Sequence, residues 1–510
     1  MKIILLPFSL LLFQVMMAQD TPVTDSVKVA GSLSLKPRDT GSIIKTGNTW
    51  PRNTKIFDTS IDNRPRNNYG GLLNDDPVYN PKYAWWKPAV RVVTTNAFNW
   101  AVSRYIFNYD WAYISLETWK YNLKHGWVWD DDHFGTNFIG HPHTGNLYFN
   151  TARANGYSFW ESFPYAVGGS LVWEYFGENT QPSKNDMINT PVSGMFLGEV
   201  LYRISSNILD DRARGANRVW REIIAGVLNP SRALNRLTQG KMFRVTTKEV
   251  YQKEPLNITL SGGIHKVNDN NKFGTGVTNY NINLQLDYGD PFEVRHRKPF
   301  DLFRLRTESS LGENRKLLDN VTGYGILFGK NIIKGSNGLL IGGFQYFDYW
   351  NNKVFELGTL GFGVGLISKI PLGGHSQIYS SLHLAAVPLA GNNTSFGPDT
   401  SLFRDYNFGG GLEAKIEEMF HLTKFVSLGF NGYYYWIHNY ENLPGNSTIG
   451  ILKPRVLVNL SRSISIGMEH HIYYVNRYLD KIPTLHLTRT EQKFFLQVFL
   501  EDPGRKGRYH

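Results

Sequence analysis

The segment YNINLQLDY, residues 280–288, shows the pattern that decides the fold of this chain. Every second side chain, from Tyr280 through Ile282 to Tyr288, is apolar, and the residues between them are Asn, Asn, Gln and Asp. Alternation of this kind predicts a β-strand with one apolar and one polar face. The segment DYNFGGGLEAKIEE, residues 405–418, repeats the pattern, and SISIGMEHHIYY (463–474) and KFFLQVFL (493–500) follow it less strictly.

About twelve such segments follow one another after residue 246, each about as long as a tilted membrane-spanning strand. They begin near Asn257, Asn279, Asp301, Val321, Gly338, Val354, Ser376, Arg404, Phe425, Ser447, Ser463 and Thr490. Alternation fits either a soluble sandwich or a transmembrane barrel. The strand lengths, and polar faces of Gly, Asn and charged residues suited to a wet lumen, favour the barrel. So do aromatic residues that resemble an interfacial girdle: Tyr433, Tyr434, Tyr435, Trp436, Tyr473 and Tyr474.

The N-terminus predicts export. A single Lys precedes a mainly apolar run from Ile3 to Val15, and Ala18 offers a cleavage site, which is the pattern of a secretory signal peptide. The run is too short to span a membrane. The chain has no cysteine, which excludes disulfides, thiolate metal sites and cysteine nucleophiles. For an exported chain with a net charge of +11, outer-membrane lipid or lipopolysaccharide is the expected neighbour rather than nucleic acid.

Between the polar lead-in and the strands, the hydrophobic period becomes helical. The predicted helices are Val90–Asn108, a second from Asp110 to a stop at Gly126, Gly135–Asn155, Ser158–Phe176, Ser183–Ile208 and Asn217–Val227. The predicted fold is therefore α+β and multidomain, with an all-α module before an antiparallel transmembrane β-barrel of about twelve strands. The predicted units are a signal peptide (1–18), an extended or disordered lead-in (19–84), a helical domain (85–245) and an outer-membrane barrel (246–510), assembled with the help of the barrel-assembly machinery.

Residues 127–202 place His, Asp, Glu, Asn and Arg between apolar helical runs, where polar groups are costly unless they are paired or bind something. If this centre is catalytic, His141 or His133 is the acid or base, and Glu174 and Asp186 orient it or hold a metal. Further candidates for ligand binding are Asn137, His143, Arg153, Asn185, Thr190, Glu199 and Arg203.

Several chemistries remain open for this centre. His133, His141, His143, Asp132, Glu174 and Asp186 are ligand types for zinc, manganese or iron, but there is no HExxH motif, and helix caps with hydrogen-bonded core histidines explain them as well. Ser170, Ser183 and Ser193 are candidate nucleophiles without a GxSxG elbow. Arg153, Lys184 and Arg203 suit an anion near helix N-termini, although Glu199 and Arg203 also have the spacing of an i,i+4 ion pair. The sequence identifies no cofactor or metal.

The motifs of this region are DDDHFGTNFIGHPHTGNLYFNTARANGYSFWES, residues 130–162, and SLVWEYFGENTQPSKNDMINTPVSGMFLGEVLYR, residues 170–203. In their order they resemble an uncharacterised family of bacterial envelope proteins, a domain of unknown function, over about residues 85–245. The resemblance implies that a helical module precedes a barrel. The order of DxxHF, WE, PSxND and GxxxGE also resembles, more weakly, the VanZ-like membrane proteins. Neither resemblance implies a reaction.

Two functions follow as hypotheses. In the first, an outer-membrane barrel carries a helical domain, periplasmic or within the barrel, that binds or modifies an envelope lipid or glycan. In the second, the barrel is a channel or scaffold without enzymatic activity, and the helical domain is its plug or brace. A soluble secreted β-protein is the third alternative. The sequence does not indicate an oligomeric state.

Overall fold

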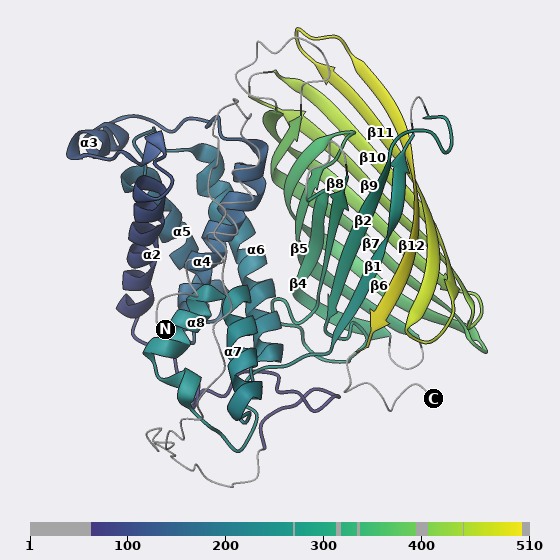
Figure 1. The fold of residues 1–510 in the computed structure, drawn as a ribbon, viewed down its shortest axis with the longest axis horizontal. Coiled ribbons are helices and arrows are strands. Elements are labelled where there is room, and N and C mark those ends of the chain that lie inside the picture. The colour runs from purple at the N-terminus through teal and green to yellow at the C-terminus, as the bar shows by residue number, and fades with distance from the viewer. Residues whose placement is uncertain are drawn as a thin grey trace, which may run out of the picture.

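The chain folds into a helical module followed by a closed β-barrel (Figure 1), so the predicted fold class is confirmed. The computed structural model describes residues 63–268, 271–312, 318–333, 337–393, 406–441 and 443–501. The predicted signal peptide and most of the lead-in lie outside the described residues. The helices of the module are α2 (Trp86–Tyr105), α3 (Leu116–Lys124), α4 (His141–Arg153), α5 (Phe159–Phe176), α6 (Lys184–Ile208), α7 (Gly215–Leu228) and α8 (Pro230–Thr238).

Capping residues set the helix starts where the sequence predicts them. Ser158 Oγ accepts a hydrogen bond from the backbone N–H of Glu161, whose carboxylate accepts one from the backbone N–H of Ser158, and Ser183 caps α6 in the same position. The predicted helix from Gly135 begins instead as a π-helical turn, and Pro142 lies in the first turn of α4, where a missing N–H costs no hydrogen bond. The sequence did not predict α8. Among the described residues, no helix has both the length and the apolar character needed to cross a membrane.

The barrel is a closed antiparallel sheet in which each strand pairs with its neighbours in sequence and β1 pairs with β12. This closure leaves no sheet edge unpaired. The strands are β1 (Leu256–Val267), β2 (Thr278–Tyr288), β3 (Phe303–Leu311), β4 (Asn320–Ile333), β5 (Gly338–Asn351), β6 (Glu356–Gly373), β7 (Ser376–Asn393), β8 (Tyr406–His421), β9 (Val426–Asn439), β10 (Gly445–Asn459), β11 (Ile464–Leu479) and β12 (Leu485–Leu500).

The outer face of the barrel carries a belt of exposed apolar side chains. Its members come from strands all around the sheet: Leu260, Ile264, Tyr280, Ile282, Phe328, Ile341, Val364, Leu382, Leu384, Leu412, Leu428, Leu452, Val456, Ile466, Phe494 and Leu496. An exterior of this kind fits a hydrocarbon surround. The predicted girdle is half wrong. Tyr434, Trp436 and Tyr474 are exposed on this face, whereas the alternate residues Tyr433, Tyr435 and Tyr473 are buried in the interior.

The lumen is filled by charged side chains that pair across it. Arg304 and Arg306 on β3 both bind Glu417 on β8, and Lys415 Nζ lies 2.6 Å from Asp348 Oδ2 on β5. These strands are not neighbours in the sheet, so the contacts cross the barrel. The charged residues of the polar faces therefore bind one another across the lumen, which alternation along single strands did not predict.

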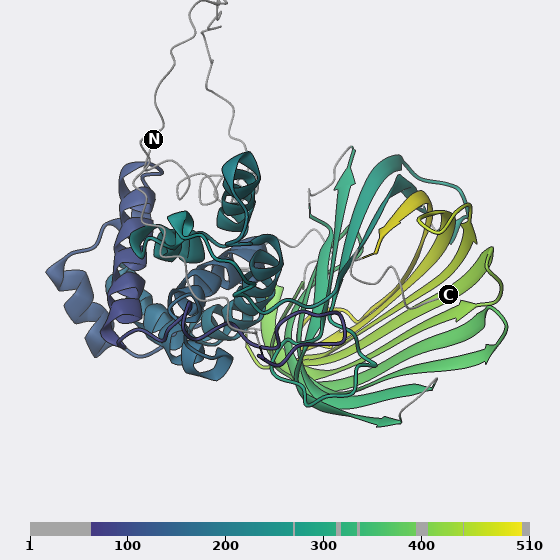
Figure 2. The ribbon, with the colours of Figure 1, turned by 90° about the horizontal axis from the view of Figure 1, so that it is seen from below.

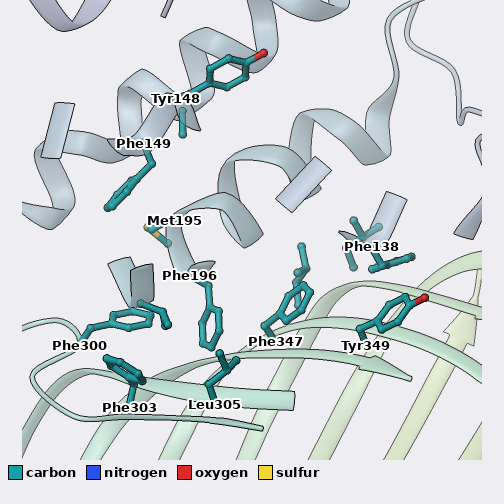
Figure 3. Packing of buried hydrophobic residues seen from close by; sticks show 14 of the residues in the cluster. Phe138, Tyr148, Phe149, Met195, Phe196, Phe300, Phe303, Leu305, Phe347 and Tyr349 are labelled. Carbon is teal, nitrogen blue, oxygen red and sulfur yellow. The ribbon is translucent and has the colours of Figure 1, made fainter. Parts of the chain in front are cut away.

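The helical module packs against the outside of the barrel wall. Figures 1 and 2 show it beside the barrel in two perpendicular views, so the alternative placement within the barrel is wrong for the described helices. Aromatic side chains of the module meet outward-facing residues of β3 to β8 (Figure 3): Phe196 stacks on Phe347 with ring centroids 5.8 Å apart. Phe138 lies over Gly358 and Gly391, where a Cβ atom on either glycine would come within 2.4 Å of its ring. The close contact needs glycine at both strand positions.

Candidate functional site

Helices α4 and α6 run side by side in the same direction and carry a polar cluster at each end. They approach closely at Gly145 and Gly194, since a Cβ atom on Gly145 would lie 1.7 Å from the carbonyl oxygen of Thr190. At the N-terminal ends lies the acidic centre, defined here as Asp130, Asp132, His141, Glu174 and Asp186 with the amides and hydroxyls that hold them. At the C-terminal ends lies the basic pocket, described below.

Amide side chains organise the acidic centre. Asn185 Nδ2 lies 2.6 Å from Asp130 Oδ2, 2.9 Å from Asn137 Oδ1 and 3.0 Å from Asp186 Oδ1. Asn137 Nδ2 donates to Asp130 Oδ1 and to the hydroxyl of Tyr406, which is a barrel residue. The centre is therefore fixed both to the helix pair and to the outer wall of β8.

His141 lies among the carboxylates. Its Nδ1 is 3.0 Å from the hydroxyl oxygen of Thr190, and its Nε2 is 3.1 Å from Asp186 Oδ1 and 3.7 Å from Asp132 Oδ2. Burial by itself lowers the pKa of His141, but the hydrogen bond and charge of Asp132, with the charge of Asp130, raise it above its ordinary value. The imidazole thus favours its charged form because the carboxylates surround it.

The carboxyl groups divide their protons unequally. Burial and the neighbouring charge of Asp130 raise the pKa of Asp186 well above its ordinary value. Burial opposes ionisation of Asp130 too, but hydrogen bonds from Asp186 and Asn185, with the charge of His141, lower its pKa. Burial also raises the pKa of Glu174, whose Oε2 accepts a hydrogen bond from the backbone of Ser183. Asp130 therefore carries the negative charge, and Asp186 retains the proton that the two carboxyl groups share.

The basic pocket is a cavity of about 430 Å³ between the module and the loop that joins β2 to β3. Six cationic side chains line it, with Asp75 as the acidic member of the lining: Arg153, Arg203, Arg232, Arg236, Lys241 and Lys298. Tyr202, Tyr251, Phe159 and Trp160 supply aromatic surface. Trp160 and Lys298 are exposed, whereas Arg232 and Lys241 are buried, so the pocket has an open rim and a buried floor.

Some of these cations are neutralised by the protein itself. Arg153 and Arg203 both bind Glu199 at 2.7 Å, and Arg203 also reaches Asp301 at 3.2 Å, which joins the module to the barrel. The two guanidinium groups hold the pKa of Glu199 below its ordinary value against the opposing effect of burial. Arg236 likewise binds Glu222 at 2.6 Å.

Arg232 and Lys241 form no ion pair with any described carboxylate. One guanidinium nitrogen of Arg232 donates to the carbonyl of Tyr202 and to the hydroxyls of Ser205 and Ser206. Lys241 is 7% exposed, and burial together with the charges of Arg244, Arg236 and Arg232 lowers its pKa to about 7. Two buried cations without a direct ion pair therefore lie next to a cavity whose lining holds a single acidic residue, Asp75, and the lining carries an excess of positive charge.

The structure separates the residues that the sequence grouped together. Six of them meet in the acidic centre: Asn137, His141, Glu174, Asn185, Asp186 and Thr190. Arg153, Glu199 and Arg203 lie at the other end of the helix pair. His133 is exposed, and burial lowers the pKa of His143 to about 4, so this imidazole is neutral. Of the candidate nucleophiles, Ser170 and Ser183 bond to neighbouring polar groups and Ser193 bonds within α6.

Sequence reasoning missed Asp130, which contacts several residues of the acidic centre, because successive Asp residues before a helix are also common as a complement to the helix dipole. It also missed Arg232, Arg236, Lys241 and Lys298. The segment NPSRALNRLTQGK, residues 229–241, carried a usable signal: Asn-Pro predicts a cap and a first helical position, and Arg232 and Arg236 are four residues apart.

Residues 126–231 match a protein family described as "Domain of unknown function (DUF3943)", as the motifs predicted. The acidic centre lies wholly within this match, and the barrel follows it. No curated protein matches the chain.

Several solved outer-membrane barrels are similar to the C-terminal half. The NanC porin has 10% identity and a TM-score of 0.26, over 48% of this chain and 98% of that chain. The outer membrane channel DcaP of Acinetobacter baumannii has 6% identity and a TM-score of 0.22, over 48% of this chain and 96% of that chain. OmpT of Vibrio cholerae, an outer membrane protein, has 8% identity and a TM-score of 0.24, over 48% of this chain and 96% of that chain. Scores this low add no argument to the closed sheet and apolar belt, which are themselves the features of an outer-membrane barrel.

Proposed function

We propose that this protein is an outer-membrane barrel whose helical module binds the anionic headgroup of an envelope lipid in the basic pocket. The observation that carries the proposal is a pair of buried cations without an ion pair to any described carboxylate, Arg232 and Lys241, on the floor of a cavity that is large enough for a phosphorylated headgroup. A phosphate group accepts several hydrogen bonds and supplies the missing negative charge.

The exposed aromatic surface favours a lipid over a soluble anion. Trp160 is 54% exposed at the rim of the pocket, and indole rings favour the boundary between water and hydrocarbon. On α7 the usual amphipathic arrangement is inverted, because Arg218 and Glu222 point inward into ion pairs. The outward face of α7 is apolar and exposed: Val219, Trp220, Ile224 and Val227. A helix with this face suits the surface of a membrane.

The competing function as an open channel has less support. A conducting pore needs a water-filled lumen, whereas charged side chains of this lumen bind one another across it. The module also lies against the outer wall rather than in the lumen, so it braces strands β3 to β8 instead of plugging the barrel (Figure 2). Bracing and lipid binding are compatible, since the pocket lies at the joint between module and barrel.

Lipid binding by the purified full-length protein tests the proposal. In neutral detergent, native mass spectrometry and thermal unfolding are followed while phosphatidylglycerol, lipid A or phosphatidylcholine is added. We expect the two anionic lipids to bind and to raise the unfolding temperature, because a ligand that binds only the folded state stabilises it. The pair of variants Arg232→Gln and Lys241→Met should each weaken binding about tenfold, the effect of losing about 1.4 kcal/mol.

Lys184→Met is the matched control, because it removes the same charge from an exposed site at the opposite end of α6. It should bind like the parent protein. Equal affinity for phosphatidylcholine, or equal loss in all three variants, contradicts the proposal. Stabilisation by inorganic phosphate alone to the same degree identifies a soluble anion as the ligand and contradicts the lipid assignment.

A further inference from the structure

We propose that the acidic centre is a binding site for one divalent transition-metal cation of the zinc or manganese kind, held by His141, Asp130 and Asp132, with Asp186 as a fourth ligand. This inference is independent of lipid binding, because the acidic centre and the basic pocket lie at opposite ends of α4 and α6. One imidazole nitrogen with several carboxylate oxygens is a donor set that both metals accept.

The ligand atoms already lie together. One donor atom from each of Asp130, Asp132 and His141 can be chosen so that all three lie within 4.8 Å of one another. Asp186 Oδ1 is 3.1 Å from His141 Nε2. The donors come from three separate segments, namely the loop before α4, the start of α4 and the start of α6. A cation would therefore tie these segments to each other.

The orientation of His141 points to a ligand rather than to a core hydrogen bond. The hydroxyl of Thr190 occupies Nδ1, which directs Nε2 toward the carboxylates. Nε2 is buried, and despite its closeness to Asp186 it has no hydrogen-bond partner with acceptable geometry among the described residues. A polar group on the remote nitrogen and a second nitrogen directed at carboxylates is the arrangement found around metal-bound histidines.

The balance of charge gives the same answer. Elsewhere in the module each buried carboxylate is matched by guanidinium groups, as Glu199 is by Arg153 and Arg203. Among the described residues no Lys or Arg forms an ion pair with Asp130, Asp132 or Asp186, and His141 is their cationic contact. Asp186 is buried, Asp130 is half-buried and Asp132 is exposed, and carboxylates that are removed from water are costly unless they are paired or bind a metal.

Oxygen and nitrogen neighbours hold the proposed ligands in place. Ser183 Oγ and Asn185 Nδ2 both bond Asp130 Oδ2, at 2.9 Å and 2.6 Å, and Asn137 bonds Asp130 Oδ1. Such contacts fix a carboxylate before the metal arrives and sharpen its affinity. Asp132 is exposed at the edge of the centre, which gives a cation a route from solvent.

The chain provides matched controls for a direct test. Asp131 is the neighbour of Asp132 in the sequence, and His133 lies eight residues before His141. Both Asp131 and His133 are exposed, and neither belongs to a group of potential ligands among the described residues. The full-length protein is purified in detergent, stripped with a chelator and titrated with Zn²⁺ or Mn²⁺. Calorimetry gives the stoichiometry, and thermal unfolding reports the stabilisation.

We expect one cation per chain and a rise in unfolding temperature. His141→Ala and Asp132→Asn should weaken binding at least tenfold, while His133→Ala and Asp131→Asn bind like the parent protein. Asp132→Asn lies at the exposed edge, so it keeps the test decisive if His141→Ala fails to fold. Absence of binding to the stripped protein overturns the proposal, and so does an equal loss in the His133→Ala or Asp131→Asn variants.

Discussion

The lumen of the barrel and the basic pocket of the module both bury arginine and lysine, but they neutralise them differently. In the lumen, Glu417 binds Arg304 and Arg306, and Asp348 binds Lys415. In the pocket, Arg232 and Lys241 have no described carboxylate as a partner. Where the chain supplies the opposite charge itself, burial serves the fold. Where it does not, we propose that a ligand from outside supplies the opposite charge.

Breaking the lumen network should give the largest effect. Glu417→Gln leaves the half-buried Arg304 and Arg306 without their shared carboxylate, and we expect a loss of about 3 kcal/mol, the lower end of the cost of breaking a buried ion pair. We expect the folded barrel to unfold at lower temperature and at lower urea concentration, as followed by its heat-modifiable migration in gels. Glu418→Gln is the control, since this neighbouring carboxylate is half-buried and bonds Ser380 instead of an arginine. A Glu417→Gln variant as stable as the parent contradicts the structural role of the lumen charges.

A substitution at the contact between the module and the barrel should give the second-largest effect. Gly358→Ala places a Cβ atom 2.2 Å from the ring of Phe138, so the ring or the strand must move. Overpacking of this kind costs about 1–3 kcal/mol. Limited proteolysis of the module should then speed up while the barrel stays resistant. Gly262→Ala on β1 is the matched control, because its nearest neighbour lies at 3.8 Å. Equal protease sensitivity of the two variants contradicts a tight joint at Phe138.

The difference between the two regions also explains what the sequence revealed. Alternation along single strands predicted all twelve strands, because the apolar and polar faces of a strand can be identified from the sequence of that strand alone. The position of His141, Glu174 and Asp186 between apolar helical runs likewise predicted a part of the acidic centre. The basic pocket was predicted only in part: Arg153 and Arg203 were candidates for binding an anion, but Arg232, Lys241 and Lys298 were missed because they come from distant parts of the chain. The packed lumen was missed for the same reason: Arg306 and Glu417 are 111 residues apart.

Removing a buried charge that has no ion pair should change the free energy of unfolding in the opposite direction to removing a paired charge. Lys241→Met keeps the apolar stem and removes a charge that is costly to bury, so the free energy of unfolding should stay the same or rise by about 1 kcal/mol near neutral pH. Binding of phosphatidylglycerol should fall in the same variant. Urea unfolding and lipid binding measured on one preparation check both statements. A marked loss of stability shows that Lys241 is part of the fold and contradicts the contrast with the lumen.

The pH dependence of Lys241 gives the smallest and most specific effect. Its pKa in the folded protein is about 7, against 10.5 for an ordinary lysine, because burial and three nearby arginines oppose its charge. Below pH 7 the ammonium group is protonated in both the folded and the unfolded chain, so it contributes no pH dependence. Between pH 7 and about 10 the unfolded chain holds the extra proton, and stability therefore rises with pH, by at most about 1.4 kcal/mol per unit.

Anion binding should follow the opposite course, because only the protonated lysine attracts a headgroup. Affinity for phosphatidylglycerol should be highest below pH 7 and should fall by at most about tenfold per unit above it. Comparing the parent with Lys241→Met at each pH isolates this residue from other titrating groups, since the variant lacks both the rise in stability and the fall in affinity. Parallel pH profiles in the two proteins contradict an uncompensated lysine in the pocket, and would leave Arg232 as the cation that demands an anion.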